Sequence, residues 1–462
     1  MKELRGKALY RLMRFCCCLA FGLYGYATHS GISSLSSIIS TKNRYDAGVL
    51  GGVQETRPFR EALGNPTGPY IIPMVASSYT LAATFISCAV PTYMAEMSLT
   101  EKERGPEVAF QCIFLVSGCA FAYWVDFGFT RLDNQISWRV PIGFQAGLAA
   151  VSGVGMFLLP DTPRWYYLRG HLEEGDKILS RLYDRPVLDS DVQTTRESIL
   201  KSLELESEET KTLNPIDLFW DRTNLRVGRR LRIAFLMLSI QQMMGINVAV
   251  YYSVTIFSQI GLSSTLSQLL AAVMNTIFAI GSLFLPSTIE IFGRRNILMF
   301  SAGGLTICLS IFVAMIGSQD PTLAKQWVAV AAIIVSNLMF GYGWIGVCWL
   351  YGPEIASLQF RHIGGAASSF GEWLFCFITA FAGGIGLEKV GWKLWLWCLL
   401  SCAVAMPFVY FMCPETTGKT LEEIDLLFQK ANESHHNNAD SLDARSSEKD
   451  EVHYVHQETT PV

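Results

Sequence analysis

Amide side chains interrupt the apolar stretches of this sequence in a pattern that could do chemistry. In "QQMMGINVAVYY", Gln241 and Gln242 are followed by Asn247, with a glycine between them that loosens a helix. Asn275 and Gln111 stand in two other apolar stretches. An amide donates and accepts hydrogen bonds at once, so these residues can bind a small polar solute or bond to a neighbouring helix. Both interpretations require helices that bring the amides together.

Long apolar stretches predict the elements that position these amides. Of 462 residues, 50% are hydrophobic and only 16% are charged, and the mean hydropathy is positive. This composition is typical of a membrane protein with several spans, each of about 20 mostly apolar residues. We expect ten spans at most, at residues 8–26, 71–94, 109–128, 139–159, 231–257, 266–287, 297–317, 327–351, 364–387 and 393–413. The predicted class is an all-α membrane protein in contact with a lipid bilayer.

Composition also excludes several classes of function. The formal net charge is −4, so nucleic acid is not an expected partner. The twelve cysteines are scattered without a CxxC pair, and the seven histidines lie mostly in the tail. Neither pattern predicts a metal site or a redox cofactor. We therefore expect no cofactor, no metal, no catalytic residue and no enzymatic activity.

Changes in polarity divide the chain into four parts. These are a first helical bundle, a polar linker, a second bundle and a disordered tail, at residues 1–165, 166–228, 229–428 and 429–462. The linker segment "HLEEGDKILSRLY" has the periodicity of an amphipathic helix. Its expected apolar stripe is Leu172, Ile178, Leu179 and Leu182.

Clusters of Lys and Arg predict the orientation in the membrane. They lie before the first span, around Arg164, at residues 226–232 and at residues 294–295. Because basic segments favour the cytoplasmic side, both termini are expected there, and the plasma membrane is the expected location. No cleavable signal peptide is evident.

Similar segments recur in the two halves of the chain. "PTYMAEMSLTEKERGP" places Glu96 shortly before Arg104, and "YGPEIASLQFRHIGG" places Glu354 shortly before Arg361. The segments "PDTPRW" and "PETTGK" follow at similar distances. Two related halves facing each other are typical of transporters that bind a solute at the membrane midplane.

Together these motifs resemble the sugar porters of the major facilitator superfamily, the fungal hexose and pentose transporters above all. The motifs are "QQMMGINVAVYY", "FGRR", "PDTPRW", "YGPEI" and "PETTGKTLEEID", in the family's order. The resemblance runs from Leu4 to Phe428. It implies two bundles of six helices around a central cavity, sugar held mainly by the second bundle, and facilitated diffusion or proton symport.

Two interruptions separate this chain from the family pattern. The segment at 27–44 is inserted within the family's first helix, and parts of helices two to four are missing where residues 84 and 85 meet. The first bundle would then be incomplete, with about ten spans in the whole chain instead of twelve. The insert is either a re-entrant loop or a retained intron or gene-model error.

The resemblance implies which residues contact the sugar. They are Gln111, Gln241, Gln242, Asn247, Asn275, Trp349 and Trp373. Hydrogen bonds between helices are the alternative for the amides, and packing is the alternative for the tryptophans. Where the family commonly has Asn before the tryptophan of helix eleven, this chain has Glu372, which leaves other polyols, sugar acids and pentoses open.

The resemblance implies two further roles for charged residues, in proton coupling and in a cytoplasmic gate. Asp46 matches the acid that couples proton movement in symporters, but the segment that would hold its arginine partner is missing. Coupled transport through Asp46 is therefore not expected. A cytoplasmic gate of salt bridges is expected, with ordinary positive-inside anchoring as the alternative. The gate residues are Glu96, Arg104, Arg294, Arg295, Glu354 and Arg361.

The predicted function is transport of a sugar or related polyol across a membrane by alternating access, with or without protons. One alternative is an inactive product of splicing or of a gene-model error. Another is a nontransporting sugar sensor with the same fold.

Overall fold

The computed structural model describes residues 5–6, 8–17, 93, 97, 101–129, 131–132, 134, 136–157, 159–212, 226–318, 322–356, 361–419, 424 and 427–428. Every regular element within these ranges is a helix. Residues 8–17, within the span predicted at 8–26, are helical. The helices that follow before residue 226 are α6 (Glu101–Phe129), α7 (Ile136–Phe157), α8 (Pro163–Leu168), α9 (Leu172–Tyr183) and α10 (Ser190–Thr212). After it come α12 (Val227–Met243), α13 (Ile246–Tyr251), α14 (Ser253–Gln259), α15 (Ser264–Leu283), α16 (Leu285–Phe292), α17 (Arg294–Ile316), α18 (Leu323–Ile355), α19 (Arg361–Lys389), η2 (Gly391–Lys393) and α20 (Leu394–Met412).

Seven helical segments in the described ranges are long and apolar enough to cross a membrane. They are Ala109–Phe129, Val227–Tyr251, Ser264–Leu283, Arg294–Ile316, Leu323–Ile355, Ile363–Lys389 and Gly391–Met412. They confirm the span predicted at 109–128 and the six predicted after residue 230. Helix α7 covers residues 139–157 of the stretch predicted at 139–159. The predicted span at 71–94, the insert at 27–44 and the junction at 84–85 lie outside the described residues, apart from Tyr93.

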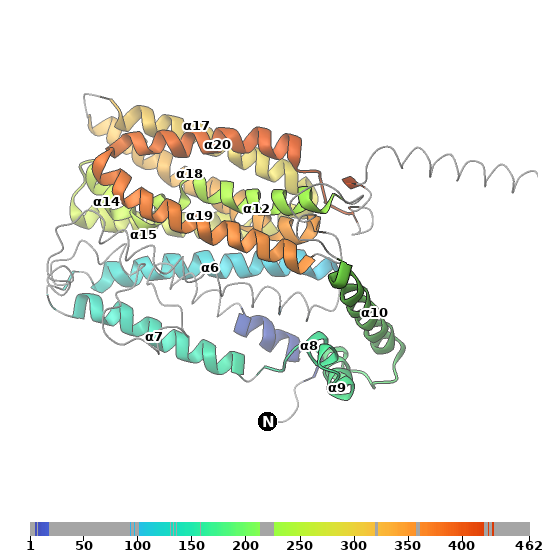
Figure 1. Ribbon diagram of the computed structural model, residues 1–462. Helices are drawn as coiled ribbons and strands as arrows, with labels where there is room; N and C mark the ends of the chain where they lie inside the picture. Colours follow the sequence, from blue (N-terminus) through green and yellow to red (C-terminus); the bar gives the residue numbers. More distant parts are fainter. Residues whose placement is uncertain are drawn as a thin grey trace, which may run out of the picture.

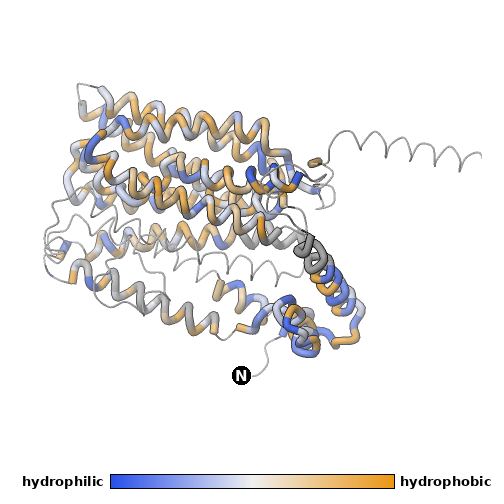
Figure 2. The backbone as a smooth tube through the Cα atoms, viewed as in Figure 1, coloured by the Kyte–Doolittle hydropathy of each residue, from blue (hydrophilic) through white to orange (hydrophobic). Residues whose placement is uncertain are grey.

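The long helices lie side by side with roughly parallel axes (Figure 1). Helix α17 packs against α18 and α20, α12 packs against α19, and α15 packs against both α18 and α6. Helices α8, α9 and α10 gather beyond one end of the long helices (Figure 1). The tube in Figure 2 is mostly apolar along the helices of the second half and mixes polar with apolar residues in α9 and α10.

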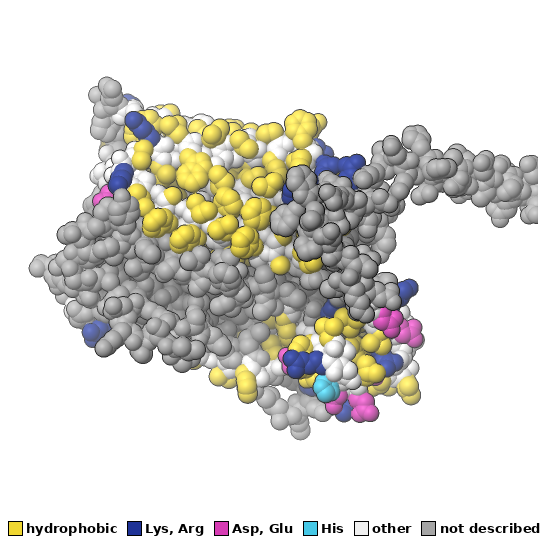
Figure 3. All heavy atoms as spheres, viewed as in Figure 1, with side chains coloured by type: hydrophobic (Ala, Val, Ile, Leu, Met, Phe, Trp, Pro, Cys, Tyr) yellow, Lys and Arg dark blue, Asp and Glu magenta, His cyan; other side chains and the backbone are white. Residues whose placement is uncertain are grey.

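Apolar side chains cover the outside of the second half. Figure 3 shows them spread over one face of the long helices, with Lys and Arg side chains near the ends of that face. The most exposed large ones on α17 and α20 include Phe300, Ile307, Leu400 and Phe411, at 63–73% exposure. A surface of this kind suits contact with lipid, where each helix satisfies its own backbone hydrogen bonds.

The amphipathic helix predicted in the linker is present as α9. Ile178, Leu179 and Leu182 are buried as expected. Leu172 is 42% exposed, so its assignment to the apolar stripe was wrong. It is the first residue of the helix, where fewer neighbouring turns can cover a side chain.

A break divides the helix that carries the "QQMMGIN" motif. Helix α12 ends at Met243 and α13 begins at Ile246, with Gly245 at a φ of +92° between them. A second irregularity at Tyr252 separates α13 from α14. The break confirms that the glycine loosens this helix, and it leaves Gln242 and Asn247 on opposite sides of the loosened turn.

Replacing Gly245 with alanine should destabilise the protein by about 2 to 4 kcal/mol, because the left-handed backbone disfavours a Cβ and the added atom would crowd Cys398. That Cβ would lie 2.5 Å from Cys398 Sγ. Gly303→Ala is the control, since its nearest neighbour outside the helix would be Met406 Sδ at 3.8 Å. Melting of the purified proteins should show a clear loss for the first variant alone. Equal melting temperatures would show that the break tolerates a side chain.

Close packing of α12 and α19 sets the register of the site between them. Phe235 stacks on Phe370 with ring centroids 6.2 Å apart and meets Phe375 edge-on at 6.1 Å. A Cβ on Gly371 would lie 2.5 Å from the carbonyl oxygen of Phe235, so only a glycine permits this approach. The residue after this glycine, Glu372, is thereby held against the end of α12.

Candidate functional site

A chain of four polar side chains links α12 and α13 to α19. Gln242 Nε2 donates to Glu372 Oε1, and Asn247 Nδ2 donates to Gln242 Oε1. Asn247 Nδ2 also lies 3.1 Å from Thr379 Oγ1. All four side chains are at most 9% exposed. We call these residues the amide chain: Gln242, Asn247, Glu372 and Thr379.

The amide chain spans the break in the helix. Gln242 precedes Gly245 and Asn247 follows it, so their hydrogen bond bridges the loosened turn. A movement of α13 relative to α12 would change this bond and the bonds to α19 together. The four residues can therefore exchange bonds with one another for bonds to the hydroxyl groups of a solute.

Gln241 faces a different helix from Gln242. Its Nε2 donates to the carbonyl oxygen of Trp344 in α18 at 2.8 Å, and its Oε1 has no hydrogen-bond partner among the described residues. Consecutive helical residues point about 100° apart, which explains the separation. The amide of Gln241 therefore makes a hydrogen bond between two helices, which is the alternative to a role in sugar binding. Its Oε1 remains as an acceptor that a ligand could use.

Gln111 and Asn275 also keep buried polar atoms without partners in the described part of the chain. Gln111 in α6 is 1% exposed, and neither of its amide atoms is hydrogen-bonded. Asn275 in α15 donates to the carbonyl oxygen of Ala271 at 2.9 Å, but its Oδ1 is unbonded. Buried polar atoms are usually satisfied, so water or solute is the expected partner.

The two predicted tryptophans lie on different helices. Trp349 of α18 is partly buried against the hydrophobic core, and Trp373 of α19 is 3% exposed. Neither position tests a role in sugar binding, which stays a prediction. Thr379 was not predicted, although it stands two helical turns after Glu372 and so on the same face of α19.

Helix α6 makes hydrogen bonds to the broken helix and to α15. Tyr123 OH donates to the carbonyl oxygen of Val250, and Ser253 Oγ donates to Tyr123 OH at 2.7 Å. Trp124 Nε1 donates to Thr276 Oγ1 of α15 at 3.0 Å. The first half of the chain is therefore in direct contact with the α13–α14 segment next to the amide chain.

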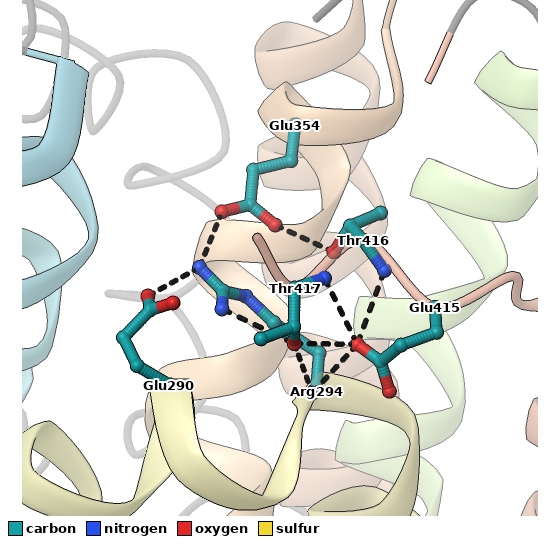
Figure 4. A network of polar contacts seen from close by, with 6 residues as sticks. All are labelled: Glu290, Arg294, Glu354, Glu415, Thr416 and Thr417. Carbon is teal, nitrogen blue, oxygen red and sulfur yellow. Dashed lines mark hydrogen bonds and ion pairs between the residues drawn. The ribbon is translucent and has the colours of Figure 1, made fainter. Parts of the chain in front are cut away.

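A second polar group, the Arg294 network, joins the ends of α16, α17 and α18 to the segment after α20 (Figure 4). It consists of Glu290, Arg294, Glu354, Glu415, Thr416 and Thr417. Arg294 Nη2 lies 2.7 Å from Glu290 Oε1 and 3.2 Å from Glu354 Oε1. Thr416 Oγ1 donates to Glu354 Oε2 at 3.0 Å. The "FGRR", "YGPEI" and "PETTGK" motifs thus meet at one place.

The predicted gate residues separate into three groups. Arg294 and Glu354 form an ion pair within the second half, whereas Arg295 donates to the carbonyl oxygen of Tyr410 at 2.6 Å and lies over its ring. Arg104 and Arg361 lie in α6 and α19, but their side chains are outside the described residues, as is Glu96. Asp46 also lies outside them. Salt bridges between the two halves therefore stay a prediction.

Glu415 caps the start of α17 from the other end of the second half. Its carboxylate accepts hydrogen bonds from the backbone N–H groups of Arg294 and Arg295, at 2.9 and 3.0 Å. A negative charge at a helix N-terminus is favourable. Partial burial acts to raise the pKa of Glu415, but hydrogen bonds from Thr417 and from the backbone outweigh burial and lower this pKa.

Glu415→Gln should lower the melting temperature at pH 7, because the amide removes the charge that α17 favours. A lowered folded-state pKa means that the carboxylate stabilises the fold above its usual pKa of 4.5 and loses this effect as the pH falls further. The difference from the unmodified protein should therefore shrink below pH 4.5. Glu388→Gln, at an exposed position of α19, is the matched control and should show no difference at either pH. If the difference in melting temperature between Glu415→Gln and the unmodified protein does not depend on pH, the charge of Glu415 does not stabilise the start of α17.

Comparisons with known proteins agree with this arrangement. A sequence model of the family described as "Sugar (and other) transporter" matches residues 79–428. The sugar transporter STL1 of Saccharomyces cerevisiae is 30% identical over 389 residues, which are 83% of this chain and 66% of STL1. The high glucose sensor RGT2 of the same yeast is 31% identical over 359 residues, which are 75% of this chain and 46% of RGT2.

The fold has solved counterparts. The structure of the major facilitator superfamily proton:xylose symporter XylE with 6-bromo-6-deoxy-D-glucose superimposes with a TM-score of 0.65. It covers 92% of this chain and 100% of the symporter at 19% identity. At that identity the likeness shows the fold, which is the one predicted from the motifs. The chain spans about two thirds of the length of STL1 and less than half of that of RGT2.

Proposed function

The chain belongs to the sugar transporter family of the major facilitator superfamily, and on that basis we propose that it carries a sugar or related polyol across a membrane by alternating access. The observation that carries the proposal is the amide chain between α12, α13 and α19. Such side chains both donate and accept, as a solute with several neutral hydroxyl groups requires.

The break at Gly245 supports the alternating-access part of the proposal. A solute that replaces the bond between Gln242 and Asn247 would draw the two sides of the break into a new position. Tyr123 of α6 would transmit this movement to the first half, because it is bonded to the carbonyl oxygen of Val250 in α13. Binding at one site would thus be linked to the relative position of the halves.

Affinity is expected to be modest, as release requires. A neutral hydrogen bond contributes about 0.5 to 1.5 kcal/mol net, and association costs reduce the sum of several such bonds. Five or six bonds then give a dissociation constant of about tens of micromolar to millimolar. The location proposed is the plasma membrane with both termini and the Arg294 network on the cytoplasmic side, supported by the basic residues there.

Uptake into proteoliposomes tests the proposal. The purified full chain would be reconstituted and supplied with radiolabelled D-glucose, D-xylose, D-sorbitol and glycerol, with empty liposomes as the blank. We expect saturable uptake of at least one solute, inhibited by an excess of the unlabelled compound. Binding of a solute without uptake would favour a sensor. If correctly assembled protein neither binds nor takes up a solute, the alternative of an inactive product of splicing or of a gene-model error is favoured.

A further inference from the structure

Glu372 is a buried carboxyl group in the middle of the proposed site. It is 7% exposed, and no described Lys, Arg or His forms an ion pair with it. The nearest arginine of α12, Arg232, stands ten residues before Gln242, which is about 15 Å along the helix axis. In the sequence, Glu372 stands out only as a departure from the family pattern.

The two oxygens of Glu372 differ in their surroundings. Oε1 accepts the hydrogen bond from Gln242 Nε2, which fixes the orientation of the carboxyl group. Oε2 is buried and has no hydrogen-bond partner among the described residues. One oxygen is thus held by the amide chain, and the other is available to a ligand or a proton.

The titratable groups around Glu372 supply no compensating positive charge. Its charge acts on the thiols of Cys112 in α6, Cys348 in α18 and Cys376 in α19. The phenol of Tyr251 in α13 also lies at this place, with its oxygen 4.0 Å from Cys376 Sγ. These groups are neutral at ordinary pH.

We propose that Glu372 carries the proton for coupled transport, binding it on Oε2 and sharing it as an O–H hydrogen bond with a hydroxyl oxygen of the bound solute. This inference rests on the proposed function. The carboxylate gains one proton from water on the entry side and returns it to water on the exit side. No covalent bond of the solute changes.

The reason for coupling is the cost of a buried charge. When the site closes around a neutral solute, water leaves and an ionised carboxylate remains in an apolar environment without a counter-ion. Hydrogen bonds from a hydroxyl group and an amide offset only part of this cost, whereas protonation removes it. Solute and proton should therefore occupy the site together. The coupling residue is then on α19, and Asp46, for which no coupling was expected, is not required.

Uptake at different pH values tests the inference with Glu372→Gln, which mimics the protonated side chain. For the best-transported solute of the four, the apparent KM of the unmodified protein should rise from pH 7 to pH 10, by up to about tenfold per pH unit. Glu372→Gln should transport with a KM that does not depend on pH and should not move protons with the solute. Glu388→Gln, the same change at an exposed site of α19, should keep the original profile.

The outcomes separate the inference from the proposed function. If the unmodified protein transports a solute and Glu372→Gln keeps the same pH profile, the inference is wrong and the function stands. If the KM of the unmodified protein does not depend on pH, the inference is likewise wrong and the function stands. If no solute is taken up at any pH, the proposed function fails and the inference fails with it.

A second measurement needs no variant and applies even if Glu372→Gln does not fold. Dicyclohexylcarbodiimide modifies protonated carboxyl groups in apolar surroundings, and mass spectrometry locates the modified residue. Glu372 should be labelled more at pH 5 than at pH 8, and the transported solute should protect it. Asp126 of α6, the other carboxyl group buried in the described spans, should gain no protection. Labelling of Glu372 that depends on neither pH nor solute would overturn the inference.

Discussion

Replacing Gln242 with alanine is expected to weaken solute binding at least tenfold. Gln242 is the central member of the amide chain, and its loss leaves a buried carboxyl group and a buried amide each short of one bond. An unsatisfied buried polar group costs about 1 to 3 kcal/mol, and about 1.4 kcal/mol corresponds to a factor of ten. Uptake kinetics in proteoliposomes would measure the change as a rise in KM or a loss of transport.

Gln259→Ala is the matched control for this prediction. Gln259 lies after the break, whereas Gln242 lies before it, but Gln259 also bonds to α19, through Nε2 and the carbonyl oxygen of Leu387 at 3.3 Å. It is outside the amide chain, so its loss should leave the KM within a factor of about two. If both variants transport like the unmodified protein, the amide chain is structural and the solute binds elsewhere.

Arg294→Ala is expected to cause the largest loss of stability, towards the lower end of about 3 to 5 kcal/mol. Removing one member of a buried ion pair leaves the other charge without compensation. The side chain of Arg294 is only 7% exposed and that of Glu354 is 21% exposed, whereas Glu290 is half exposed and should contribute little. Thermal or denaturant unfolding of the purified protein would measure the difference.

Two further variants show whether the pair itself is responsible. Arg295→Ala removes the neighbouring guanidinium, which contacts the carbonyl oxygen and the ring of Tyr410, and should cost about 1 kcal/mol. Adding Glu354→Gln to Arg294→Ala should recover part of the lost stability, because it removes the uncompensated charge. Equal effects of the two arginine substitutions, or no recovery in the double variant, would contradict the assignment.

Local pattern alone was sufficient to predict most of the described fold. Runs of apolar residues predicted the membrane helices of the second half, because a span must be long and continuous wherever its neighbours lie. The spacing of apolar residues predicted the stripe of α9, with an error at Leu172. Periodicity shows which residues share a face of a helix, but it does not show at which residue the neighbouring helices stop burying that face. The sequence predicted a loosening at Gly245 within one continuous span, and the structure shows that the helix ends there, since glycine accepts a positive φ that other residues avoid.

The sequence by itself determined the helices, the family motifs and the residue types able to bind hydroxyl groups. Only the tertiary structure decided which of these residues act together. Gln241 and Gln242 are identical and adjacent, yet one bonds to Trp344 in α18 and the other to Glu372 in α19. Glu415 caps a helix that begins 121 residues earlier in the chain. Such partners depend on the packing of distant helices, because a hydrogen bond forms only where two groups are brought within about 3 Å.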